Sequence, residues 1–173
     1  MSKNFNKHNQ DIVDIIASVR RVTKVVKGGS RFSFSILVVV GDKKGKVGFA
    51  SAKDRELNDA KNKAIKLARK NMFHVPLRSG KTLHHDILTR YCSASVLLRS
   101  AKLGTGIIAG GAMRHIFECL GIQDIVAKSL RSSDPYNMIT ATMLGLKSIS
   151  TPRAIAERRG IRFGVLLSRR ENI

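Results

Sequence analysis

Three apolar stretches in the first third of the chain predict β-strands. Residues 12–26 alternate apolar and polar positions, and although some of these positions would also line one face of a helix, their many β-branched side chains favour a strand. Residues 32–40, which read FSFSILVVV, and residues 46–52 are predicted strands as well. Glycine-containing turns at residues 27–30 and 41–45 connect the three stretches, so we expect an antiparallel meander.

The period of the apolar positions then changes to that of a helix. Between residues 56 and 72 the apolar side chains recur on one helical face, and they are Leu57, Ala60, Ala64, Leu67 and Ala68. Asp54 is the expected N-cap, because its carboxylate could accept a hydrogen bond from a free backbone N–H of the first turn. The first unit is therefore predicted to be β-β-β-α, with one face of the sheet covered by this helix.

A second unit follows a stretch that contains Pro, Ser and Gly, residues 76–81. Residues 83–88 and 94–100 are predicted to be strands. The glycine-rich stretch 103–111 is expected to open a helix that runs to Leu120 and is stopped by Gly121 in the C′ position.

The remaining pattern completes this second unit. Residues 122–130 predict another strand, and Asp134 with Pro135 begins a helix that runs to about Leu146, with proline in its first turn. The order of elements is then β-β-α-β-α. After Ser148 the periodic pattern weakens.

Together these elements predict an α+β protein of two small domains that cover residues 12–75 and 80–150. Residues 1–11 are expected to form a flexible N-terminus, and residues 151–173 a basic C-terminal tail that becomes ordered on a partner. A chain of 173 residues is long enough for two such domains to bury their own cores.

The charge of the chain narrows the choice of partner. Its 32 Lys and Arg against 12 Asp and Glu give a formal net charge of +20. Both halves carry it, since residues 1–75 have a net charge of +11 and residues 76–173 one of +9. Small soluble domains usually carry a net charge of magnitude about 2 to 8, so this excess predicts binding to a polyanion. Nucleic acid is the first candidate, ahead of an anionic membrane surface and an acidic partner protein.

Several classes of protein are disfavoured by what the sequence contains. The 43% of hydrophobic residues is too high for a disordered basic tail, and no apolar run reaches the roughly 18 residues of a membrane-spanning helix. The first ten residues do not read as a secretory signal. Cys92 and Cys119 match no metal-ligand spacing, and the five histidines and the acids form no recognisable metal site or catalytic constellation. We therefore expect neither a catalytic residue nor a metal.

One motif resembles a dinucleotide fingerprint. The sequence from Gly104 to Ala109 fits G-x-G-x-x-A, and Asp124 follows at a suitable distance. Too little chain remains for several parallel βαβ units, Asp124 is predicted to lie inside the next strand, and the preceding strand region carries Arg99 and Lys102. A glycine run at a helix start can also bind phosphate or allow another chain to approach closely. A nucleotide-dependent enzyme is therefore only the rival hypothesis.

The strongest functional signal is the first predicted hairpin. Basic side chains flank the Gly28-Gly29 turn, where glycine lets backbone amides approach phosphate oxygens and cations replace condensed counterions. Phe32 and Phe34 share one face of the next strand; they could stack on bases, but we expect them to pack in the core under the helix.

These residues also carry a family resemblance. The segments VTKVVKGGSRFSFSILVVVGDKKGKVGFA, LARKNM and GTGIIAGGAMR occur in the order and spacing of the bacterial-type small-subunit ribosomal protein number five family. The likeness extends from about Arg20 to Met143. It implies an N-terminal domain like a double-stranded-RNA-binding fold without its first helix, and a C-terminal α/β sandwich with a left-handed crossover.

The resemblance also implies a function. Members of this family are non-catalytic; they bind small-subunit rRNA, bridge the head and body of the subunit, and influence decoding accuracy through contact with neighbouring ribosomal protein four. The hairpin would reach toward the spectinomycin site, the messenger RNA would enter nearby, and ribosomal protein eight would meet the second domain. A cytoplasmic, bacterial-type ribosome is expected, and the lack of a transit peptide disfavours an organellar one. No cofactor, membrane or small-molecule substrate is implied.

Two sets of site residues follow from the hairpin and from the resemblance. The residues expected to bind RNA are Arg20, Arg21, Thr23, Lys24, Lys27, Gly28, Gly29, Arg31, Lys53 and Arg55. The residues expected at a protein interface are Gly104, Thr105, Gly106, Gly110, Gly111 and Arg114. The chain departs from the usual family pattern at Ala50, Ala52, Asp54, Asp86 and Thr140.

Overall fold

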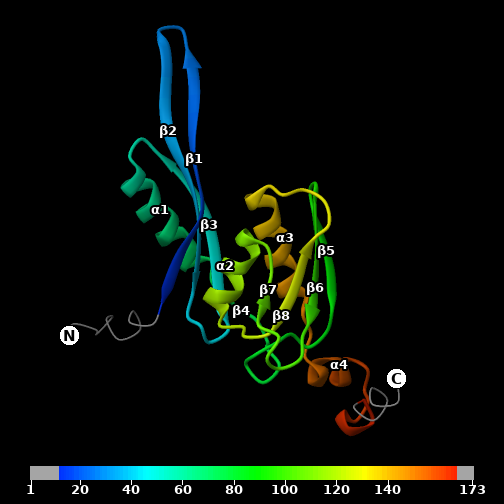
Figure 1. The fold of residues 1–173 in the computed structure, drawn as a ribbon. Helices are drawn as coiled ribbons and strands as arrows, with labels where there is room; N and C mark the ends of the chain where they lie inside the picture. The colour runs from blue at the N-terminus through cyan, green and yellow to red at the C-terminus, as the bar shows by residue number, and fades with distance from the viewer. Residues whose placement is uncertain (1–11, 167–173) are drawn as a thin grey trace, which may run out of the picture.

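The computed structural model describes residues 12–166, which form two four-stranded sheets with helices between and beside them (Figure 1). The first sheet has the order β1-β2-β3-β4, and every neighbouring pair is antiparallel. Its strands are β1 (Val13–Val26), β2 (Gly29–Gly41), β3 (Lys46–Asp54) and β4 (Phe73–His74). The predicted meander is confirmed, and the two-residue strand β4 is an addition to it.

Helix α1 (Leu57–Lys70) follows the meander as predicted and packs on β2 and β3. It buries a row of alanines, and a Cβ added to Gly48 would lie 2.4 Å from the carbonyl oxygen of Ala68, so helix and sheet approach closely. The predicted N-cap is wrong. Strand β3 continues to Asp54, whose carboxylate accepts a hydrogen bond from Arg55 N–H, and Glu56 is the N-cap without a side-chain bond.

The second sheet has the order β5-β6-β8-β7. Strands β5 (Ile87–Tyr91), β6 (Ala94–Ser100) and β8 (Ile125–Ser129) are antiparallel neighbours, whereas β7 (Ile107–Ile108) runs parallel to β8. Helix α2 (Gly111–Leu120) connects β7 to β8. The α+β class is thus confirmed, and the handedness of this crossover stays a prediction.

Two predicted strands of this unit are shifted in position, and one of them, expected at residues 122–130, is β8, which begins only at Ile125. The strand expected at residues 83–88 begins only at Ile87; just before it the Asp86 carboxylate, not backbone of the strand, accepts the Ser100 N–H, and Leu83 is fully buried in the preceding loop. The stretch 103–111 does open α2 as predicted, since this helix begins at Gly111, but the stretch also contains the two-residue strand β7 (Ile107–Ile108). The end of α2 at Gly121, with φ of 86°, is as predicted.

Helix α3 (Pro135–Ser148) also begins as predicted. Asp134 is its N-cap and accepts a hydrogen bond from Asn137 N–H at 3.2 Å. Within the segment expected to form a basic tail the structure has α4 (Pro152–Arg158), which Thr151 caps and which buries Ala156; the tail itself stays a prediction. Residues 1–11 and 167–173, for which we expect a flexible terminus and the end of the tail, lie outside the described residues.

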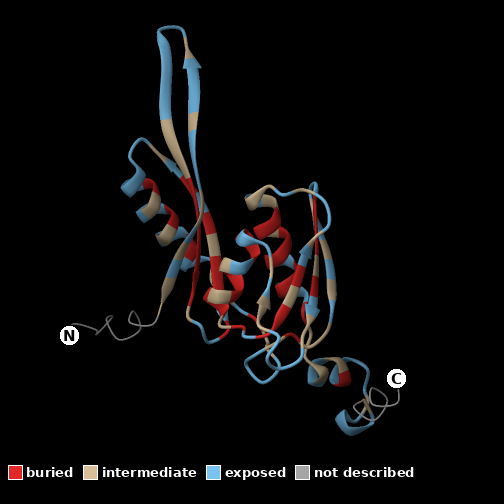
Figure 2. Ribbon diagram, in the orientation of Figure 1, coloured by how far each residue is buried: buried red, intermediate tan, exposed pale blue. Residues whose placement is uncertain are grey.

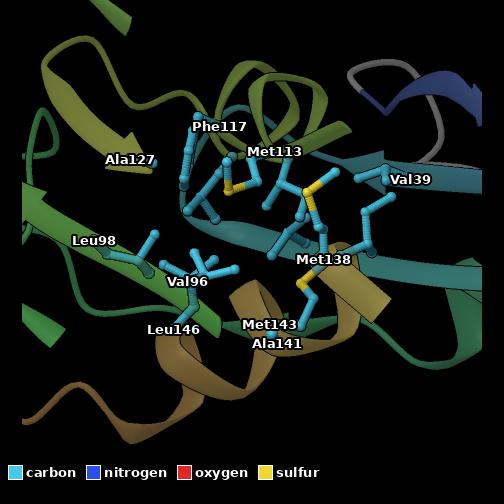
Figure 3. Packing of buried hydrophobic residues seen from close by; sticks show 14 of the residues in the cluster. Val39, Val96, Leu98, Met113, Phe117, Ala127, Met138, Ala141, Met143 and Leu146 are labelled. Atoms are coloured by element: carbon cyan, nitrogen blue, oxygen red, sulfur yellow. The ribbon is translucent and has the colours of Figure 1, made fainter. Parts of the chain in front are cut away.

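The core is continuous between the two sheets (Figure 2). Alternate residues of β2 point to its two faces, so Ile36, Val38 and Val40 pack under α1. Leu37 and Val39 point the other way, into a larger cluster with α2, α3 and the second sheet; Figure 3 shows Val39 near Met113 and Met138. The expectation that one helix covers one face was therefore incomplete. The limits 12–75 and 80–150 stay proposed domain boundaries.

Glycines allow the turn between β2 and β3 to come into backbone contact with the C-terminal end of α2. Lys43 N–H donates to the carbonyl oxygen of Cys119 at 2.9 Å, and Gly45 N–H donates to that of Leu120 at 3.2 Å. A Cβ added to Gly41 would lie 2.2 Å from the Cys119 oxygen, and one added to Gly121 would lie 2.2 Å from the Lys43 oxygen. Only glycine fits these two positions without a shift of the backbone.

Candidate nucleic-acid interface

The outer part of the β1–β2 hairpin extends beyond α1 and is exposed almost throughout (Figures 1 and 2). Its strands pair up to Val26 and Gly29, which leaves Lys27 and Gly28 as the two turn residues. Gly29 has φ of 133°, a conformation that L side chains rarely adopt. No atom lies within 4 Å of where a Cβ of Gly28 would be, so this tip is open to a ligand.

The register places several predicted RNA-binding cations on one face of the sheet. Lys24 pairs directly with Arg31, and the row formed by Arg20, Ser35 and Lys53 crosses all three strands of the meander. Directly opposite residues share a face, and like charges in such a pair are destabilising. The hairpin therefore carries an electrostatic cost that a bound polyanion would remove.

The opposite face of the same hairpin is aromatic as well as basic. It carries Arg21, Thr23, Phe32 and Phe34, by the same register. The guanidinium of Arg21 lies 4.1 Å from the centre of the Phe32 ring, which is 51% exposed. The expectation that this pair packs in the core is wrong. Phe34 is only half-buried, and neither phenylalanine belongs to a core cluster. On this face of β2 the buried apolar residues begin only at Ile36.

Arg20 has an intramolecular partner at the root of the hairpin. Its guanidinium donates to the Oδ1 atom of Asp134 at 2.6 Å, and this hydrogen bond lowers the pKa of the Asp134 carboxyl group. Since Asp134 also caps α3, the pair joins the first sheet to the second unit. A cleft of about 300 Å³ beside it is lined by Tyr136, whose ring packs edge-on against Phe49. Sequence reasoning had no signal for this contact between residues 114 positions apart.

The other predicted RNA-binding cations are exposed. Within residues 12–166 none of them forms an ion pair; they are Lys24, Lys27, Arg31, Lys53 and Arg55. Arg55 follows β3 at the start of α1, beside the Asp54 carboxylate that lies 3.8 Å from Lys63 Nζ. The structure thus collects Arg20, Lys24, Arg31 and Lys53 on one face and separates Arg21 from them.

The glycine motif forms an exposed turn, and its geometry disagrees with a dinucleotide site. Asp124 lies directly before β8, not inside a strand as predicted; it is 4% exposed and accepts a hydrogen bond from Gly106 N–H at 2.9 Å. A dinucleotide site needs this carboxylate free for a ribose and several parallel strands, whereas β7–β8 is the one parallel pair among the described strands.

This turn instead has the features of a contact surface. Gly104 and Gly106 have positive φ, and no atom lies within 4 Å of where a Cβ at Gly104, Gly106 or Gly111 would be. Leu103 and Ile108 flank it and are 75% and 54% exposed. The predicted interface residues Gly104, Thr105, Gly106, Gly110, Gly111 and Arg114 thus lie along one loop and the first turn of α2. Arg114 contacts Glu118 at 3.1 Å one helical turn on.

Reactive groups are sparse over the described part of the chain. No group of three or more His, Cys, Asp or Glu side chains there could hold a metal ion. Burial raises the pKa of the Cys119 thiol to about 12, so this group is not a thiolate nucleophile at neutral pH. No helix within residues 12–166 is long and apolar enough to cross a bilayer.

Comparisons with known proteins agree with this picture. Family profiles described as "Ribosomal protein S5, N-terminal domain" and "Ribosomal protein S5, C-terminal domain" match residues 13–76 and 89–159. A protein of Ehrlichia ruminantium (strain Gardel) named small ribosomal subunit protein uS5 is 52% identical over 171 residues, which are 98% of each chain.

Two further relatives have the same name. The protein of Bartonella quintana (strain Toulouse) is 55% identical over 97% of this chain and 92% of its own length. That of Wolbachia pipientis wMel is 51% identical over 95% of this chain and 96% of its own. The expected ribosomal, non-enzymatic identity is therefore confirmed, and the chain belongs to the ribosomal protein S5 family of the small ribosomal subunit.

Proposed function

We propose that this structural constituent of the small ribosomal subunit works in a bacterial-type ribosome and binds small-subunit rRNA through the β1–β2 hairpin. The observation that carries the proposal is the direct pairing of Lys24 with Arg31 on an exposed hairpin. Such a pair destabilises the free protein and becomes favourable when a phosphate lies between or beside the two cations. Arg21 over the half-exposed ring of Phe32 adds a second, aromatic surface on the opposite face.

The finer roles of the family are part of the same proposal. The protein would bridge the head and body of the subunit, and the core shared by its two sheets supports this role because it joins the two units. The hairpin would lie near the spectinomycin site, and messenger RNA would enter the subunit nearby. The exposed turn at Gly104–Gly111 would contact ribosomal protein four and thereby influence accuracy, and the second unit would contact ribosomal protein eight.

Salt dependence tests the rRNA contact. The logarithm of affinity falls with the logarithm of salt concentration by about 0.7 to 0.9 for each neutralised phosphate. The double variant Lys24→Gln, Lys27→Gln should therefore flatten the slope for small-subunit rRNA by roughly 1.4 to 1.8. The matched control is Lys128→Gln with Arg131→Gln, two exposed cations of the second unit. An unchanged slope for the hairpin variant would remove the hairpin from the interface.

The protein contact has a separate test. Replacing the exposed Leu103 and Ile108 by Asp should abolish co-purification with ribosomal protein four, because an apolar contact would become a desolvated pair of charges. Leu130→Asp is the control, since Leu130 is also about half exposed but lies after β8. Equal binding by both variants would contradict the proposed contact.

A further inference from the structure

A second cationic site lies in the second unit, away from the hairpin. It is an open pocket of about 490 Å³ between the loop that precedes β5 and the loop that follows β6. Its lining residues are Arg78, Ser79, Lys81, Thr82, Ser100, Ala101, Lys102 and Leu103. Neither Arg78 nor Lys81 was singled out by motif or spacing, and Lys102 was noted only as an argument against a dinucleotide site.

The first wall of the pocket is a tight turn. Arg78 N–H donates to the carbonyl oxygen of Thr82 at 2.8 Å, and Lys81 N–H donates to that of Arg78 at 3.1 Å. The two residues between them, Ser79 and Gly80, have φ of 52° and 68°, which are the angles of a type I′ turn. A left-handed serine is strained, and strain of this kind persists where the surroundings or a function require it.

Hydrogen bonds hold this turn against the second wall. Ala101 N–H donates to Thr82 Oγ1 at 3.2 Å, and the carbonyl oxygen of Lys102 accepts two bonds from Thr105. The carbonyl oxygen of Lys81 accepts from the N–H groups of Gln123 and Asp124, just before β8. The backbone that carries the three cations is therefore fixed before a ligand arrives, which lowers the entropy lost on binding.

The charges of the pocket are not balanced within residues 12–166. Arg78, Lys81 and Lys102 are exposed, and none of them forms an ion pair in this part of the chain. The acid beside the pocket, Asp86, is already bound to Arg99 at 3.1 Å and to Ser100. Asp124 is buried and holds Gly106. The pocket therefore has three cations on a hydrogen-bonded backbone and no acid among its lining residues. This arrangement predicts an anionic ligand.

We propose that this pocket binds the phosphate backbone of small-subunit rRNA, as a second attachment point independent of the hairpin. This inference rests on the proposed function, since it assumes that the chain binds RNA. Hydroxyl groups of Ser79 and Thr82 supply donors beside the cations, whereas no aromatic side chain lines the pocket on which a base could stack. The site thus matches sugar and phosphate rather than unpaired bases.

The test compares three variants of the full chain by salt-dependent binding to small-subunit rRNA. Replacing Arg78, Lys81 and Lys102 together by Gln should flatten the slope by about 2 to 3, at 0.7 to 0.9 per lost phosphate contact. The matched control replaces Arg90, Lys128 and Arg131 by Gln; these are three other exposed cations of the second unit. The hairpin variant Lys24→Gln, Lys27→Gln is measured beside them, and circular dichroism verifies that each variant is folded.

A local probe makes the assignment independent of total charge. Ser79→Cys in a Cys92→Ser background offers one exposed thiol among the described residues, because Cys119 is buried. A short photoactivatable group on that thiol should cross-link to rRNA in the complex, and the cross-link should disappear when Arg78, Lys81 and Lys102 are replaced.

The outcomes separate the two proposals. A slope no flatter than that of the control, or a cross-link to protein alone, would overturn the pocket assignment, while the hairpin variant still reports on the proposed function. If the hairpin variant also behaves like the control, the proposed rRNA contact of the hairpin fails with it.

Discussion

The two halves of strand β2 have opposite surroundings within one continuous ladder of hydrogen bonds. From Ile36 to Gly41 every residue is buried, with α1 on one face and α2 with α3 on the other. From Gly29 to Phe32 every residue is exposed, and the partner strand places Lys24 against Arg31. The comparison shows that pairing alone does not decide what a strand does. Burial makes the inner half a source of stability, and unbalanced charge makes the outer half a binding surface.

The largest difference is expected from one substitution made in each region. Gly41→Ala should destabilise the protein by about 3 kcal/mol, because its Cβ would meet the backbone of Cys119. Gly28→Ala should change the free energy of unfolding by less than about 0.5 kcal/mol, since the space beside it is open. Urea unfolding followed by circular dichroism measures both. Similar values would mean that the inner contact relaxes freely.

The second effect concerns side chains. Val39 is fully buried in the larger core, so Val39→Ala should cost about 2 kcal/mol through lost burial and the cavity left behind. Val25 is 80% exposed at the hairpin, and Val25→Ala should leave the stability nearly unchanged. Thermal unfolding of the pair checks the expectation; a loss of stability in Val25→Ala would show that the outer half also packs.

The third effect is the pH dependence of the contact between Arg20 and Asp134, which lies where the two regions meet. Because Arg20 holds the pKa of Asp134 below its ordinary value of 3.8, the pair stabilises the fold above that value. This stabilisation is lost as pH falls through the lowered pKa. The side chains are 55% and 31% exposed, so solvent screening limits the contribution to about 0.2 to 1 kcal/mol.

Asp134→Asn keeps a capping side chain and removes the charge, so it isolates the ion pair from the cap. The difference in stability between wild type and variant should be present at pH 7 and shrink below pH 3.8. A difference that does not depend on pH would assign the effect to capping rather than to the ion pair.

The smallest effect has the opposite sign. Lys24→Gln removes the repulsion from Arg31 and should stabilise the free protein by about 0.2 to 0.5 kcal/mol at low salt. The same variant should bind rRNA more weakly. Unfolding at low and high salt tests this, because screening should erase the gain. Destabilisation by Lys24→Gln would indicate that another group already neutralises the pair.

Local pattern was a good guide wherever one segment contains its own signal. The alternation in β1, the alanine face of α1, Asp134 with Pro135 at the start of α3 and Gly121 at the end of α2 are all where the sequence predicts them. The wrong predictions lie where contact with another segment of the chain sets the local structure. Asp54 continues a strand rather than capping a helix, because β3 pairs with β2 as far as Phe34.

The candidate site divides in the same way. The basic hairpin and the glycine turn are visible as motifs. The ion pair between Arg20 and Asp134 and the pocket at Arg78 are not visible as motifs. Each depends on residues that the fold brings together from distant parts of the chain. Short motifs with few apolar positions, such as the Thr151-Pro152 start of α4, give too weak a period to be recognised.

By itself the sequence determined the class of elements, the order of most of them, the net charge of +20 and membership of a ribosomal family. These properties follow from local periodicity, turn residues and composition, which act within a few residues of each other. Only the tertiary structure decided that the run ILVVV is buried on both faces, that Arg20 contacts Asp134, and that Arg78, Lys81 and Lys102 share one pocket. These contacts form between segments that are far apart in the sequence and that exclude water from each other when they pack. A local sequence pattern does not specify which distant segment will pack against it.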